Sequence, residues 1–156
     1  MAHRDIVSKT KRSEMMRGVA QGGTPCERTV AAMVSETGRR YRLNSRSLPG
    51  SPDISNRRRG WAIFVNGCFW HGHKNCPKTK SKRSPRIPGS NKRFWKKKLA
   101  GNRERDARKC LQLRALGVTV LIIWECQLRN ADKVRDRLMR ILERNDRRED
   151  SERGKI

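Results

Sequence analysis

The pattern of hydrophobic and polar positions predicts three helices separated by short strands. The first helix has clear boundary signals, because Thr24 can cap its N-terminus, Pro25 suits the first helical position and Gly38 can end it. Glu27, three residues after the cap, completes a capping box and falls on the face that carries the apolar residues of this helix. We therefore expect an amphipathic helix with an acidic side chain on its apolar face.

Two further helices are predicted over 92–116 and 131–145, where apolar side chains recur at intervals of three and four. On the first of these, Asp106 lies on the same stripe as Leu99 and Leu113, whereas most of the cations lie elsewhere. One acidic side chain is therefore expected to point inward, with a neighbouring arginine as its partner.

Three β-prone segments bounded by turn residues, 39–44, 53–55 and 61–67, predict an antiparallel meander. The run at 118–124 is almost entirely apolar, as expected of a strand covered on both faces. The order helix, meander, helix, strand, helix predicts an α/β fold, and 156 residues are the length of a single domain.

The ends of the chain and one internal segment lack this apolar patterning. Residues 1–22 are polar and basic and are expected to form an arm, and the proline-rich basic stretch 77–91 is expected to form a flexible loop. Residues 146–156 have nothing to bury and are expected to be disordered, which leaves 23–145 as the folded domain.

Charge narrows the possible partners. The chain holds 39 lysines and arginines against 15 acidic residues, a formal charge of +24, so nucleic acid is the first partner to expect. No apolar run has transmembrane length and the N-terminus lacks the apolar centre of a signal peptide, so we expect a cytoplasmic protein without a membrane partner. The five cysteines are then thiols or metal ligands rather than a disulfide framework.

Soft metal ligands are concentrated in one short segment. Thiolates and imidazoles suit tetrahedral Zn²⁺, and a closed site of this kind would be structural. Five candidates compete for four positions, and the spacing does not decide which histidine stays out; they are Cys68, His71, His73, Cys76 and Cys126. Cys26 and Cys110 each fall in a helix without nearby ligands and are expected to be ordinary buried cysteines.

Aromatic residues near this segment favour contact with bases. Phe69 and Trp70 directly follow a candidate ligand, and Trp95 lies among lysines and arginines, where rings can stack on bases or wedge between them. Phe94 and Trp61 are expected to pack in the core instead.

Asp53 stands out among the few acidic residues because it follows a turn and begins a strand. A hard cation such as Mg²⁺ prefers carboxylate and carbonyl oxygens, whereas an aspartate in a turn often bonds only to its own backbone. The residues therefore indicate a zinc-stabilised, basic DNA-binding domain with a candidate Mg²⁺ ligand.

Four blocks add a resemblance to this interpretation. The segments SLPGSPDI, AIFVNGCFWHGH, FWKKKLAGNRERD and GVTVLIIWEC resemble, in this order, the very short patch repair endonuclease family, and the similarity runs from about Ser8 to Leu142. Members of that family are DNA mismatch nickases. The resemblance implies a restriction-endonuclease-like fold, in which helices flank a central mixed sheet, with a structural zinc site and a catalytic Mg²⁺.

The same resemblance implies roles for individual residues. Asp53 would bind Mg²⁺ together with the main-chain carbonyl of Val65, and His71 would activate the attacking water. Asp106 would support the active site, and Glu27 would contact the waters of the metal.

His71 is then the histidine left out of the zinc site, whose ligands become Cys68, His73, Cys76 and Cys126. The last local spacing, between His73 and Cys76, is one residue longer than in some relatives. Asn66 stands where some members carry a catalytic histidine, and an amide cannot carry a proton. The aromatics that would wedge into the duplex beside the mismatch are Phe69, Trp70 and Trp95.

The implied activity is nicking of one strand 5′ to the thymine of a T:G mismatch left by deamination of 5-methylcytosine. The partners would be mismatched double-stranded DNA and other repair proteins, and the protein would be a monomer at the bacterial nucleoid. The arm 1–22 would lie against the DNA, and basic residues of 80–109 would contact phosphates. Three alternatives share the basic charge: a zinc-stabilised DNA-binding module without catalysis, a basic RNA-binding protein and a sequence-specific restriction nuclease.

Overall fold

The computed structural model describes residues 22–80, 87–88 and 91–153, together with Ser8, Thr10, Lys11, Ser13 and Glu14. The predicted arm and the middle of the predicted loop 77–91 therefore lie largely outside the described residues. The strands are β1 (Arg42–Leu43), β2 (Ile54–Asn56), β3 (Trp61–Asn66) and β4 (Thr119–Trp124). The helices are α2 (Pro25–Glu36), α3 (Lys92–Ala115) and α4 (Ala131–Arg153), with short 3₁₀ helices η1 (Pro77–Lys80) and η2 (Glu125–Arg129).

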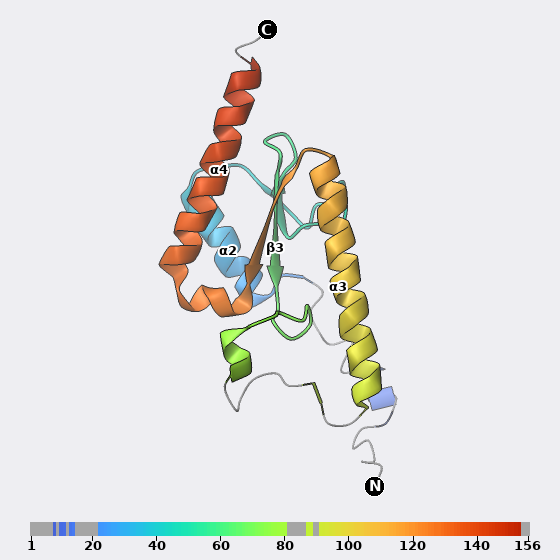
Figure 1. Ribbon diagram of the computed structural model, residues 1–156. Helices are drawn as coiled ribbons and strands as arrows, with labels where there is room; N and C mark the ends of the chain where they lie inside the picture. Colours follow the sequence, from blue (N-terminus) through green and yellow to red (C-terminus); the bar gives the residue numbers. More distant parts are fainter. Residues whose placement is uncertain are drawn as a thin grey trace.

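The four strands form one mixed sheet in the order β1-β2-β3-β4. The predicted antiparallel meander of the first three strands is confirmed, and β4 pairs parallel to β3 after the crossover through α3. Helices α2 and α4 lie on one face of the sheet and α3 lies on the other (Figure 1). The α/β class and the mixed sheet flanked by helices are thus confirmed.

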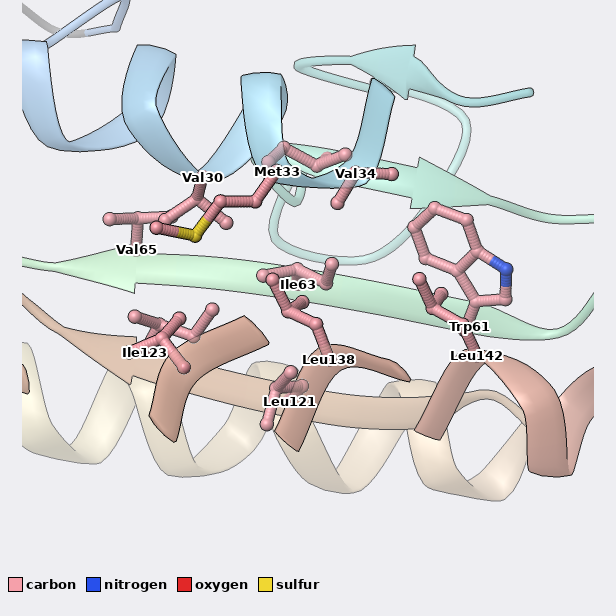
Figure 2. Close-up of a cluster of buried hydrophobic side chains, with 12 residues drawn as sticks. Val30, Met33, Val34, Trp61, Ile63, Val65, Leu121, Ile123, Leu138 and Leu142 are labelled. Carbon is pink, nitrogen blue, oxygen red and sulfur yellow. The ribbon is translucent and has the colours of Figure 1, made fainter. Parts of the chain in front are cut away.

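Strand β3 supplies both halves of the core because successive side chains point to opposite faces. Trp61, Ile63 and Val65 pack with residues of α2 and α4, as Figure 2 shows, whereas Ala62 and Phe64 pack on the α3 side. All six residues of this strand are buried. The alternation places the last residue of β3, an asparagine, on the same face as α3.

The N-terminus of α2 forms as the sequence predicts. The Thr24 hydroxyl accepts a hydrogen bond from the backbone N–H of Glu27 at 3.2 Å, and Pro25 occupies the first turn. Gly38 follows the helix with a φ of 71°, a left-handed conformation that suits glycine.

Helix α4 differs from the prediction at its C-terminal end. Residues 146–153 continue the helix, so the expectation that 146–156 are disordered is wrong for this part. Arg147 lies 3.9 Å from Glu143, one turn earlier, and Asp146 binds Arg39 at 2.8 Å and also pairs with Arg59. Side chains with good helix propensity and these ion pairs support the extra turns without any apolar burial.

Within the described ranges, no helix has both the length and the apolar character that a membrane span requires.

Candidate active site and metal centre

A pocket of about 1030 Å³ opens where β3 ends, between the start of β2 and the middle of α3. Its lining includes residues from five separate parts of the chain. Seven of the sequence-predicted site residues are among them: Glu27, Asp53, Val65, Asn66, Trp70, His71 and Asp106. The fold therefore brings the candidate acids and one histidine to a single cavity.

Asp53 lies next to the end of β3. Its Oδ2 accepts a hydrogen bond from the backbone N–H of Val65 at 2.7 Å. The pKa of Asp53 is raised to about 6, mainly by burial and in smaller part by the negative charge of Glu27, while the hydrogen bond from Val65 opposes the rise. The charged form of a carboxylate in this environment is stabilised by a nearby cation.

The buried charge of Asp53 predicts a gain in stability when it is removed. We expect Asp53→Asn to raise the free energy of unfolding by on the order of 1–2 kcal/mol at pH 7 in buffer without Mg²⁺. Asparagine is neutral and can still accept the hydrogen bond from Val65. Urea denaturation of both proteins measures the difference.

The pH dependence of this difference provides a further check. Because the folded-state pKa of Asp53 is raised, its destabilising effect is full above about pH 6 and fades as the pH falls toward 4. Asp132→Asn, at a carboxylate that is 94% exposed, is the matched control and should change little. Equal stability of wild type and Asp53→Asn at pH 7 would contradict the prediction.

His71 and Asp106 form the closest polar contact in the pocket. Nδ1 of His71 lies 2.6 Å from Oδ2 of Asp106, and Nζ of Lys109 lies 3.4 Å from the other carboxylate oxygen. Burial by itself would raise the pKa of Asp106, but the hydrogen bond from His71 and the charge of Lys109 outweigh it and lower the pKa. The predicted arginine partner of Asp106 is wrong; its partners are a histidine and a lysine.

This pair fixes the chemistry open to His71. When the Nδ1 proton is held by Asp106, Nε2 is the nitrogen that can accept a proton from water. The loop that carries His71 is also held, because the side-chain amide of Asn102 donates to the backbone carbonyl of Trp70 at 2.7 Å. A carboxylate, an oriented imidazole and a fixed loop suit general-base catalysis.

Glu27 lines the pocket and also helps to cap the N-terminus of α2. One carboxylate oxygen accepts from the backbone N–H of Gly23 at 2.7 Å, and the other accepts from the hydroxyl of Thr24 at 2.9 Å. The capping interaction therefore occupies both oxygens of a side chain that also lines the cavity.

A second cluster lies beside this pocket, beyond the ends of β3 and β4. The ligand atoms of its members all lie within 4.8 Å of one another; they are Cys68, His73, Cys76 and Cys126. The sheet explains the meeting of distant residues: Asn66 pairs with Trp124 in parallel register, and one cysteine follows each of them at the same offset. His71 is not a member, because it faces Asp106 instead.

The donor set of this cluster fits a tetrahedral zinc ion. Three thiols and one imidazole converge, the three cysteines are buried, and none of them forms a disulfide. Burial raises the pKa of Cys68 to about 12, and the neighbouring thiols of Cys126 and Cys76 raise it as well. The ring of His73 is stacked on Trp124, with centroids 4.1 Å apart and planes 5° apart, which fixes its orientation.

The predicted base-contacting aromatics form one surface cluster. The ring centroid of Phe69 lies 5.0 Å from that of Trp70 and 5.5 Å from that of Trp95. Phe94 joins them at 5.5 Å from Trp95 and is 41% exposed, so its predicted core position is wrong, whereas Trp61 is buried as expected. Phe94 lies five residues before Leu99, off the inward stripe of the helix.

Three further residues of α3 contribute to the site: sequence reasoning gave Asn102 no role, and it expected Lys98 and Lys109 only among the basic residues that contact phosphates. Lys98, Asn102 and Lys109 all line the pocket. The signal was present in the helical spacing, because each lies within two turns of Asp106 at intervals of three or four. Lys98 also places its ammonium 5.7 Å from the rings of Trp70, Phe94 and Trp95.

Comparison with known proteins agrees with this geometry. The family model described as DNA mismatch endonuclease Vsr matches residues 4–78. The DNA mismatch endonuclease Vsr of Escherichia coli (strain K12) is 38% identical over 132 residues, which cover 85% of this chain and 80% of that protein. The type II nicking enzymes V.XorIIP of Xanthomonas oryzae pv. oryzae and V.NmeAIP of Neisseria meningitidis are 37% and 36% identical, covering 89% and 88% of this chain and 97% and 94% of their own. At this identity over most of both chains, the protein belongs to the Vsr family of DNA mismatch endonucleases.

Proposed function

We propose that this protein is a Mg²⁺-dependent endonuclease that nicks one DNA strand 5′ to the thymine of a T:G mismatch. The observation that carries the proposal is the 2.6 Å contact between His71 and Asp106 in the pocket that also holds Asp53. The relatives, which are a mismatch endonuclease and two nicking enzymes, support cleavage of a single strand. The mixed sheet with flanking helices is compatible with the restriction-endonuclease-like fold that we propose for it.

In this proposal the side chains divide the hydrolysis of a phosphodiester between them. His71 takes a proton from the attacking water at Nε2, and Asp106 holds Nδ1 and stabilises the imidazolium that forms. Asp53 and the carbonyl of Val65 would hold Mg²⁺, which when bound stabilises charge on the phosphate oxygens and the leaving oxygen. The water oxygen forms the new bond to phosphorus as the bond to the leaving oxygen breaks.

Two further residues of the pocket have supporting roles. Glu27 would contact metal-bound waters at the edge of the cavity that it lines. Asn66 is 6% exposed and can offer hydrogen bonds but no proton transfer, so His71 alone would act as the base.

Mismatch selectivity would come from the aromatic cluster. Rings that enter the duplex beside a base pair must unstack it, and a mismatched step costs less to unstack than a matched one. The close contacts among Phe69, Trp70 and Trp95 support a single wedge rather than separate insertions. The arm 1–22 and basic residues of 80–109 would add phosphate contacts. The protein would act as a monomer at the bacterial nucleoid, and other repair proteins would be its partners.

The cluster of Cys68, His73, Cys76 and Cys126 would hold a structural Zn²⁺. Its position supports this role, because two of the wedge aromatics and His71 lie between the first two ligands in the chain. A bound ion would fix that loop to the end of β4 and so align the wedge and the general base.

Nicking of end-labelled duplexes tests the proposal. Each duplex carries either a T:G or a matched C:G pair in varied flanking contexts, and reactions run with Mg²⁺ or without divalent cation, using wild type and Asp53→Ala. We expect Mg²⁺-dependent cleavage of one strand, 5′ to the mismatched thymine, that Asp53→Ala loses. Binding without cleavage in every context would favour a non-catalytic DNA-binding module, and cleavage of both strands of matched duplex would favour a restriction nuclease.

A further inference from the structure

A second groove, of about 1340 Å³, runs along the edge strand β1 and the turn between β2 and β3. Arginine is the commonest residue in its lining, and none of the described residues that line it is acidic. The arginines are Arg39, Arg40, Arg42, Arg46, Arg57 and Arg58. Neither the aromatic wedge nor helix α3 contributes to this surface.

The two basic segments that form the groove are held against each other. Arg42 pairs with Ser55 across the β1–β2 ladder. The side chain of Asn56 donates to the backbone carbonyl of Arg40 at 2.8 Å and accepts from the backbone N–H of Arg59 at 2.9 Å. The arginines are therefore carried on a fixed backbone, which lowers the entropy lost when they bind a ligand.

Several arginines of the groove have no carboxylate partner among the residues that the structure describes. Arg39 binds Asp146 at 2.8 Å and is thereby compensated. Arg40, Arg42 and Arg57 are exposed and form no ion pair with any carboxylate in the described part of the chain. Guanidinium groups in such a row suit phosphate oxygens, to which each can donate two hydrogen bonds.

The groove is continuous with the candidate active site. Asn44 and Arg46 line both the groove and the pocket that holds Asp53 and His71. A polyanion that reaches the pocket can therefore continue along β1 without leaving the protein surface.

We propose that this groove binds the sugar-phosphate backbone of the duplex arm on one side of the cleaved phosphate. The proposal rests on the proposed function insofar as it takes DNA as the ligand of the active site. Binding there extends the footprint to base pairs that the wedge does not touch, and it contributes affinity without base specificity.

The salt dependence of duplex binding tests the groove directly. The variant Arg42→Gln/Arg57→Gln removes two exposed charges from it, and Arg40→Gln/Arg46→Gln is an independent second variant. The matched control, Arg140→Gln/Arg144→Gln, removes two exposed charges from α4, outside the groove and the pocket. Each lost phosphate contact makes the negative slope of log K against log salt smaller in magnitude by about 0.9, so we expect a reduction of about 1.8 in each groove variant and none in the control.

Duplex length then locates the contact. Two duplexes are used: one is shortened on the 5′ side of the central base pair, and the other is shortened on its 3′ side. We expect the difference between wild type and groove variants to vanish on one of them and to persist on the other. Slopes equal to wild type, an equal loss in the control, or a difference that persists on both truncated duplexes would overturn the proposal. The salt series uses matched duplex, whereas the truncated duplexes carry T:G at the central pair to fix the position of the protein. Binding is measured without divalent cation, so a failure of nicking leaves both outcomes unaffected.

Discussion

Replacing His71 by alanine is expected to lower the rate of nicking at a T:G mismatch by roughly 10²- to 10⁴-fold, the usual contribution of a positioned general base. Duplex affinity, metal content and the unfolding midpoint should stay close to wild type. The reason is that His71 contacts Asp106 at the rim of the pocket and takes no part in the Cys/His cluster. Single-turnover nicking at saturating enzyme measures the chemical step.

His73→Ala is the matched control, since it removes the same side chain two positions away. Because His73 belongs to the cluster, its replacement should lower the metal content and the stability of the protein. Any loss of nicking in this variant should follow from that loss of metal and stability and not from the loss of a general base. If His71→Ala nicks at the wild-type rate, another group takes the proton and the assignment of the base is wrong. If both variants lose metal equally, the assignment of His71 to the active site and of His73 to the metal cluster is wrong.

If the cluster holds the zinc that we propose, Cys126→Ser is expected to release it and to destabilise the protein by more than about 4 kcal/mol, as losses of structural metal sites do. Cys126 follows β4 and the other three ligands follow β3, so the ion would add a bond between two segments that the sheet, the stacking of His73 on Trp124 and the ion pair of Lys78 with Glu125 already hold together. Zinc content of the purified protein and thermal unfolding are the measurements.

Cys110→Ser provides a closely matched control. Cys110 and Cys126 are both 7% exposed, but Cys110 lies in α3 and outside the cluster. The control should keep one zinc per chain and lose only the smaller energy of placing a hydroxyl in an apolar site. Full zinc content in Cys126→Ser, or an equal loss of stability in both variants, would contradict a structural metal centre.

The sequence predicted the elements well wherever a local signal sets them. The capping box at Thr24 and the apolar run that forms β4 appear in the structure as expected. The extent of β1 is not set by such a signal: the β-prone segment 39–44 is longer than the strand, which consists of Arg42 and Leu43 only and is defined by its pairing with β2. The helical turns beyond residue 145 were missed because disorder was inferred from the lack of apolar residues, whereas ion pairs and helix propensity suffice there.

The candidate site was predicted in part for similar reasons. Asp53, His71 and Asp106 could be named from local context and from family resemblance, and the structure brings them to one pocket. That the partner of Asp106 is His71 could not be read from the helix alone, because the two residues come from different parts of the chain. The basic groove was also missed, since its arginines lie in two segments that only the β1–β2 pairing brings together.

The position of Cys126 has a consequence for how the protein is made. A polypeptide emerges from the ribosome N-terminus first, so the segments that carry Asp53, His71 and Asp106 are synthesised before β4 and before the fourth thiol. Until that last segment is released, β3 lacks its parallel partner and the cluster lacks one ligand. A nascent chain therefore contains every proposed catalytic side chain before it contains the strand and the thiol that align them, which delays the ability to cut DNA until the segment through Cys126 has emerged.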